Sequence, residues 1–333
     1  MRASLFLILV AACFAALTPT AGAAVHGPPS GKVFHSGLGG YGAGAVGEFA
    51  RQSGKHPAVY QYFVSWKSGT RDLNFIRGLL ANTRRAGSRT ALAVTTKGTG
   101  LSPAAIARGE GDRFLVALNR ILAEHREPTY LRLLSEMNNG ANSYSAYDLR
   151  GHARGPAFST AQFKRAWRRA VLVLRGGDVV ALDARLARLG MPRVDTQSAT
   201  LPQPPVSFQW VPLSYGNPEI ARNHPRHWWP GSAYVDWVGT TWYSPFLAVG
   251  AFKSFYSYRL WRRKPFVFAE YGVWGAESPR FISLFFSFVK SHRRVRMVSY
   301  YQSGLLKPQF RLSTHPRSRA ALRRRLRSSR FVG

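Results

Sequence analysis

Short apolar runs alternate along this chain with longer segments in which apolar residues recur every three or four positions. The short runs predict buried β-strands, and the longer segments predict amphipathic helices. Strands are expected at residues 32–37, 58–66, 90–96, 129–136, 207–212, 234–242, 265–270 and 297–302. Helices are expected between them, at 71–85, 111–125, 160–175, 247–262, 279–291 and 316–327, with a weaker one at 46–51.

Strands that alternate with helices indicate parallel βαβ units. Eight such strands predict an α/β fold, a closed (β/α)8 TIM barrel. Residues 182–206 contain four prolines and are predicted to form a loop before the fifth strand. We expect a single barrel domain over residues 24–333 that ends in a basic helix, and we expect it to be a monomer.

Residues 1–23 are predicted to lie outside the barrel. Met1-Arg2 is followed by an apolar run from Leu5 to Leu17 and then by small residues at 21–23. This order is typical of a secretory signal peptide, and the run is too short for a membrane span. An alternative is a lipoprotein anchor at Cys13, which is the only cysteine. Either interpretation predicts an extracellular protein without disulfides.

The charge is strongly unbalanced, with 47 Lys and Arg against 15 Asp and Glu, or a net charge of +32. Such a surface can associate with polyanions, so acidic cell-wall polymers are a possible second partner. The alternative is that the arginines are spread over solvated faces, as in the last helix, where Leu322 and Leu326 predict one buried side. The chain has no zinc-finger or RNA-recognition signature, so no specific nucleic-acid partner is expected.

Two glutamates stand at the ends of predicted apolar strands. Glu136 ends the fourth strand and Glu270 ends the seventh. A carboxylate in such a place is costly unless it is paired or used. Barrel active sites lie at the C-terminal ends of the strands, so the two carboxylates are expected to meet there. Two carboxylates of this kind are typical of glycoside hydrolases.

Strand alternation adds two expectations about side-chain direction. Arg132, Leu134 and Glu136 are expected on one side of the fourth strand. The same period is expected to place Phe266 and Phe268 together with the glutamate that ends the seventh strand. Arg132 would then lie below the site and could hold a carboxylate ionised.

Several segments resemble glycoside hydrolase family 26, the β-mannanase family. The resemblance covers nearly the whole predicted mature chain, in the same order. Its segments are Arg132-Leu133-Leu134-Ser135-Glu136-Met137-Asn138, Phe268-Ala269-Glu270-Tyr271-Gly272, Trp229-Pro230-Gly231, residues 234–239 with Tyr243, residues 163–169 and residues 37–66.

This resemblance implies a retaining hydrolase that acts on a β-linked polysaccharide, with β-1,4-mannan as the first expectation. Glu136 would be the acid/base, Glu270 the nucleophile, and Tyr243 a hydrogen-bond donor to the nucleophile. No cofactor is implied. His224 and His227 lack a third ligand, so no metal site is expected.

Seven further residues are candidates for substrate binding. Each also has a structural interpretation. A buried arginine often serves only in an ion pair, and a histidine is often a hydrogen-bonded core residue. An aromatic residue near a strand end often only packs in the core. The candidates are Arg132, Tyr243, Trp66, His35, Asn138, Trp274 and Tyr301.

The chain departs from the family pattern close to the acid/base. Ser135 stands where a histidine is usual, and Asn139 begins a loop without the usual aromatic stretch. Tyr301 lies where a tryptophan is expected beneath the sugar. These departures leave open a non-hydrolytic glycan-binding barrel, or a basic protein that binds acidic wall polymers.

Overall fold

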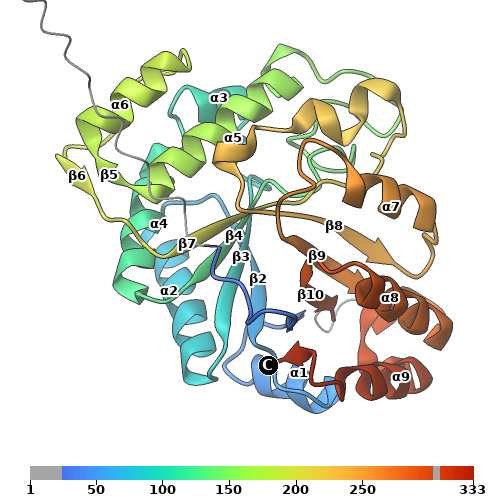
Figure 1. The fold of residues 1–333 in the computed structure, drawn as a ribbon. Helices are drawn as coiled ribbons and strands as arrows, with labels where there is room; N and C mark the ends of the chain where they lie inside the picture. The colour runs from blue at the N-terminus through green and yellow to red at the C-terminus, as the bar shows by residue number, and fades with distance from the viewer. Residues whose placement is uncertain (1–24, 303–307) are drawn as a thin grey trace, which may run out of the picture.

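Eight parallel strands close into a barrel in the computed structural model, which describes residues 25–302 and 308–333 (Figure 1). The predicted signal peptide and Cys13 lie outside the described residues. The barrel closes because the last strand, β10, pairs with β1. The expected (β/α)8 fold is confirmed. The barrel strands are β1 (Val33–Leu38), β2 (Val59–Ser65), β3 (Arg89–Thr95), β4 (Thr129–Leu133), β7 (Val206–Trp210), β8 (Trp237–Tyr243), β9 (Phe266–Gly272) and β10 (Val295–Tyr301).

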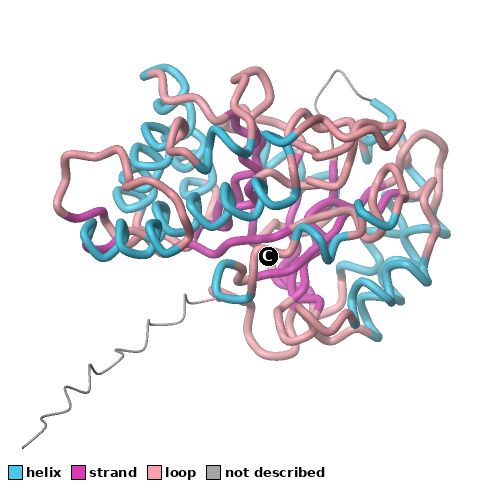
Figure 2. Tube along the Cα trace, turned by 90° about the horizontal axis from the view of Figure 1, so that it is seen from above, coloured by secondary structure: helices cyan, strands magenta, loops and turns pink. Residues whose placement is uncertain are grey.

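Helices surround these strands, as the view from above shows (Figure 2). Among the residues that the structure describes, no helix is both long and apolar enough to cross a membrane. The helices are α1 (Ala45–Ser53), α2 (Thr70–Arg85), α3 (Pro103–Ala107), α4 (Asp112–His125), α5 (Thr160–Arg175), α6 (Val179–Arg188), α7 (Val249–Ser257), α8 (Pro279–Ser291) and α9 (Pro316–Leu326). The described residues also contain three two-residue strands, β5 (Gly177–Asp178), β6 (Thr200–Leu201) and β11 (Phe331–Val332).

The barrel interior begins with an apolar layer formed by residues of seven barrel strands and by Val211, which directly follows β7. Because these residues form one cluster separate from the larger core, they must lie inside the barrel, while the larger core fills the space between strands and helices. The layer consists of Phe34, Val59, Ala91, Tyr130, Val211, Trp237, Val267, Ala269 and Met297.

Three helices differ in how they compare with the predictions. Helix α9 has the predicted form, since Leu322 and Leu326 are buried while the arginines between them are exposed. The helix expected at 247–262 ends early, because Tyr258 takes an extended conformation. Helix α3 was not predicted.

The loop predicted at 182–206 is wrong over its first residues, which belong to α6. Asp178 caps this helix by accepting a hydrogen bond from the Ala181 amide at 2.8 Å. Val179, Leu182 and Leu186 bury one face of the helix. The prolines that suggested a loop all lie beyond the end of α6.

Candidate active site

Strand β4 does not continue to residue 136 as predicted, but ends at Leu133. Leu134 and Glu136 have φ angles of 41° and 51°, a region that side-chain-bearing residues rarely occupy. Each such residue costs about 1–2 kcal/mol. The kink is held at both ends, because the Leu134 amide bonds to Val94 at 2.9 Å and the Glu136 amide bonds to Val211 at 2.7 Å.

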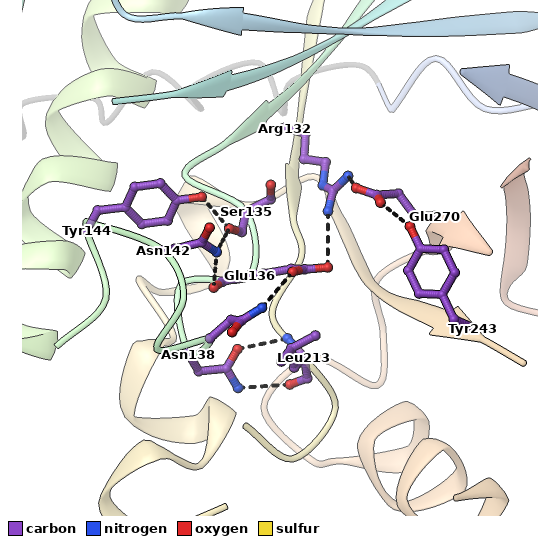
Figure 3. A network of polar contacts seen from close by, with 10 residues as sticks. Arg132, Ser135, Glu136, Asn138, Asn142, Tyr144, Leu213, Tyr243 and Glu270 are labelled. Atoms are coloured by element: carbon purple, nitrogen blue, oxygen red, sulfur yellow. Dashed lines mark hydrogen bonds and ion pairs between the residues drawn. The ribbon is translucent and has the colours of Figure 1, made fainter. Parts of the chain in front are cut away.

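The kink breaks the predicted alternation. Leu134 packs in the core outside the barrel. Arg132 and Glu136 nevertheless contact each other inside the barrel, as Figure 3 shows. Backbone strain at such a point is typical of functional sites, where surrounding contacts maintain it.

Strand β9 reaches the site through a β-bulge. Its register with β8 shifts by one residue, because Phe268 pairs with Thr240 while Glu270 pairs with Thr241. Ala269, between them, lies in the interior cluster. The extra residue lets two consecutive side chains face the interior, and the second of them is Glu270.

The predicted grouping of Phe266 and Phe268 with Glu270 is therefore wrong. Phe268 packs outward, with its ring centroid 4.9 Å from that of Phe285 in α8 and 6.4 Å from that of Phe252 in α7. Without the bulge, Glu270 would point toward the same helices.

Arg132 links the two glutamates (Figure 3). Its side chain is buried, Nη1 donates a hydrogen bond to Glu270 Oε1, and Nη2 lies 3.9 Å from Glu136 Oε1. Tyr243 donates its hydroxyl proton to the other oxygen of Glu270. The structure thus brings together four of the predicted site residues, Arg132, Glu136, Tyr243 and Glu270.

The two carboxyl groups have different surroundings. Both oxygens of Glu270 accept hydrogen bonds, and the side chain is 10% exposed. Glu136 is 20% exposed and accepts a hydrogen bond from Asn139 at 3.1 Å. Burial raises the pKa of Glu136 and the charge of Glu270 raises it further, while Arg132 and hydrogen bonds from Asn139 and Thr241 oppose the rise without cancelling it.

The raised pKa of Glu136 predicts the pH dependence of activity. If Glu136 must donate a proton, kcat/KM should fall as pH rises through its raised pKa, so the alkaline limb should lie above the ordinary value of 4.5. A pH–rate profile checks this, and Glu124→Gln, at an exposed position, serves as the control. An alkaline limb at or below the ordinary value would contradict the assignment.

The same shift predicts an effect on stability. The fold favours protonated Glu136, so this contribution is present below the ordinary pKa and is lost as pH rises through the raised one. Glu136→Gln cannot ionise and should therefore have a higher Tm than wild type at neutral pH, with the difference shrinking on acidification. Thermal scans at several pH values measure this.

The loop after Glu136 folds back and holds the kink. Tyr144 donates its hydroxyl proton to the Ser135 carbonyl at 2.6 Å. Asn142 donates to the carbonyls of Ser135, at 3.3 Å, and of Glu136, at 2.9 Å. These two side chains satisfy backbone groups that the end of the strand leaves without sheet partners, and they fix the direction of the Glu136 side chain.

We expect Tyr144→Phe to lower kcat about tenfold through the loss of one buried hydrogen bond, with little change in KM. Tyr62→Phe is a matched control, because the Tyr62 hydroxyl is buried and has no partner among the described residues. Steady-state kinetics and the alkaline limb of the pH profile measure the effect. Equal kinetics for the two variants would show that Tyr144 does not position Glu136.

Three predicted binding residues are not brought to the carboxylates. The side-chain amide of Asn138 bonds to the backbone of Leu213 in both directions, at 2.8 and 2.9 Å. His35 is buried against Phe49 on the outer side of β1. Trp66 is also buried, and its indole donates to a backbone carbonyl at 3.1 Å. Burial lowers the pKa of His35 to about 3, which keeps it neutral.

Trp274 and Tyr301 do lie near the site. Their rings contact that of Tyr243 edge to face, with centroids 5.8 and 5.9 Å away. Tyr301 also lines a hollow of ≈ 120 Å³ at the ends of β1, β2 and β10. A larger hollow of ≈ 610 Å³ lies between α5 and α6, away from the glutamates.

Sequence reasoning missed Asn139, Thr241, Asn142 and Tyr144. The asparagine-rich run after the strand was a usable signal, because asparagine side chains often bond to nearby backbone groups in loops. Thr241 carried no such signal, since a threonine in a strand is ordinary. Among the described residues, no group of three histidine, cysteine, aspartate or glutamate side chains is arranged to hold a metal ion.

No family model matches the chain, and no curated protein matches it in sequence. Solved structures do match. A mannanase from Bacillus subtilis is 13% identical with a TM-score of 0.58, and the match covers 93% of this chain and 89% of that chain. A family 26 β-mannanase from Bacteroides ovatus is 15% identical with a TM-score of 0.55, covering 90% of each chain.

The fold is similar to that of a family 26 β-mannanase. The resemblance drawn from the motifs is thus confirmed at the level of the fold. A fungal β-1,4-galactanase structure is also similar, at 10% identity and a TM-score of 0.51, with 88% of this chain covering 99% of that chain. Because the fold is shared by enzymes named for different glycans, it does not define a substrate.

Proposed function

We propose that this protein is a secreted, retaining endo-glycoside hydrolase that cleaves a β-linked polysaccharide. One observation carries the proposal. Carboxylates from two strand ends, distant in sequence, share the guanidinium of Arg132 at the C-terminal end of the barrel. The fold similarity to glycoside hydrolases supports the same reaction class.

In the proposed reaction, Glu136 protonates the glycosidic oxygen while Glu270 attacks the anomeric carbon. The bond to the leaving sugar breaks, and a glycosyl ester forms on Glu270. Glu136, now ionised, removes a proton from water, and that water displaces Glu270. The raised pKa of Glu136 suits the first step, and the two donors to Glu270 orient it for attack.

Tyr243 and Arg132 act beside the nucleophile in this proposal. Tyr243 holds one oxygen of Glu270, so the other oxygen and its contact with Arg132 determine the line of attack. Tyr301 provides aromatic surface next to this pair for the sugar. β-1,4-Mannan is the first substrate to test.

The proposal is tested by reducing-sugar release from mannans, β-glucans and xylans. Wild type should release sugar from at least one of these polymers, and Glu136→Gln and Glu270→Gln should not. If wild type matches both variants on every polymer yet still binds one, the protein is a non-hydrolytic glycan-binding barrel.

A second partner is proposed because of the charge distribution. No acidic residue follows Glu277, while α9 presents Arg323, Arg324 and Arg325 to solvent. We expect salt-sensitive retention on an acidic cell-wall polymer, weakened by replacing these three arginines with glutamine. Retention of the triple variant equal to wild type would contradict binding through α9.

A further inference from the structure

Two exposed aromatic rings meet beside the catalytic pair. Phe246 follows β8 and Trp274 follows β9, and they are 47% and 41% exposed. Their ring centroids lie 5.8 Å apart. We call these two side chains the rim platform. Large apolar side chains that remain exposed side by side often mark a binding surface.

The rim platform is connected to the nucleophile. Trp274 contacts the ring of Tyr243, whose hydroxyl donates to Glu270. Phe310 is buried beneath and contacts both Trp274, at 5.2 Å, and Tyr243, at 5.6 Å between ring centroids. The exposed rings therefore continue the aromatic wall of the site outward.

Backbone contacts fix the rim platform in place. The Trp274 amide donates to Ser244 Oγ at 3.0 Å, and the Ser244 amide donates to Gly272 at 3.1 Å. The buried indole of Trp242 donates to the Phe246 carbonyl at 2.9 Å. The two loops are thus tied to each other and to the barrel, so a ligand would meet preformed rings and little ordering cost.

We propose that the rim platform is an outer subsite that stacks on a pyranose unit of the same polysaccharide, beyond the sugar attacked by Glu270. This inference rests on the proposed function. A pyranose has an apolar face of C–H groups that packs on an aromatic ring, while its hydroxyls remain in water at an open rim. Continuity with Tyr243 and Glu270 makes the glycan chain the occupant.

This subsite would also replace the aromatic surface that the loop after Glu136 lacks. That loop carries asparagines and serine instead, and the Asn142 side chain donates a hydrogen bond to the Glu136 carbonyl. The rim platform provides exposed aromatic surface from β8 and β9. A chain held there and at the carboxylates spans more than one sugar, which favours cleavage within a polymer.

The test compares Phe246→Ala and Trp274→Ala with Phe75→Ala. Phe75 is 48% exposed but lies on α2, so it controls for loss of an exposed ring. The substrates are short and long oligosaccharides of whichever glycan wild type cleaves. We expect the ratio of kcat/KM for the long over the short substrate to fall about tenfold in both platform variants and to stay at the wild-type value in Phe75→Ala. A wild-type ratio in both platform variants would overturn the proposal.

Binding separates this inference from the reaction. In a Glu270→Gln background, retardation in polysaccharide-containing gels should decrease when Phe246 or Trp274 is replaced by alanine. Such a decrease supports the rim platform even if no glycan is cleaved. Undiminished retardation overturns it even if the glutamates prove catalytic.

Discussion

Glu270→Gln is expected to lower kcat on the order of 10⁴-fold or more, because an amide cannot replace the carboxylate as nucleophile. The glutamine keeps the size of the side chain, so the bulge in β9 should persist. Glu270→Asp is the companion variant. It keeps the charge beside Arg132 but withdraws the carboxylate by one methylene, so a comparable loss of kcat would show that position as well as charge is required.

Substrates with different leaving groups distinguish the roles of the two glutamates. Glu136→Ala should lower the rate of hydrolysis of a natural glycan about 10²–10⁴-fold. The first step should largely recover on an aryl glycoside whose phenol leaves without protonation. In the second step azide, which needs no general base, should attack the anomeric carbon in place of water and displace Glu270. Burst kinetics and the glycosyl azide product are the measurements. Equal losses on both substrates, without azide rescue, would contradict the role of Glu136 as acid/base.

The largest effect on stability is expected at a second buried ion pair. Arg169 of α5 and Asp112 of α4 are both 0% exposed. Arg169 Nε donates to Asp112 Oδ1 at 2.8 Å, and its other nitrogens bond to the backbone of Pro192 and Arg193. Asp112 also accepts from the Asp195 amide at 3.0 Å. The pair therefore joins two helices to the segment before β7.

Arg169→Met leaves the Asp112 carboxylate buried without its partner and should lower the free energy of unfolding by about 3–5 kcal/mol. Asp112→Ala should lower the free energy of unfolding by a similar amount, because it leaves the Arg169 guanidinium buried without its partner. Urea unfolding measures both. The exposed pair Arg77–Glu124, at 3.2 Å, is the control, and Arg77→Met should cost no more than about 1 kcal/mol.

A double variant completes this test. Arg169→Met combined with Asp112→Ala removes both charges, so its loss of stability should be smaller than the sum of the two single losses. Losses that simply add would show that the two side chains act independently. Losses as small as that of Arg77→Met would show that the pair contributes little.

The barrel was predictable because buried strands and amphipathic helices leave strong periodic signals in sequence. The identity of the catalytic pair was predictable because carboxylates at the ends of apolar strands are unusual. The orientation of the pair was not. It depends on the bulge at Ala269 and on positive φ angles at Leu134 and Glu136, which contacts with neighbouring strands maintain.

The wrong predictions about which strand residues face the barrel interior had a related cause. Strands of a parallel barrel are apolar on both faces, so the sequence does not show which residues face inward. Phe34 lies inside the barrel, which turns His35 toward α1. Trp66 is likewise buried in the core, while Trp274 lies in a loop and keeps its ring exposed.

The stereochemistry of the first product tests the central claim most directly. Proton NMR during hydrolysis of whichever β-glycan wild type cleaves reports the anomeric configuration at the new reducing end before it equilibrates. A double displacement through Glu270 predicts that the β anomer forms first. Initial formation of the α anomer would contradict the account.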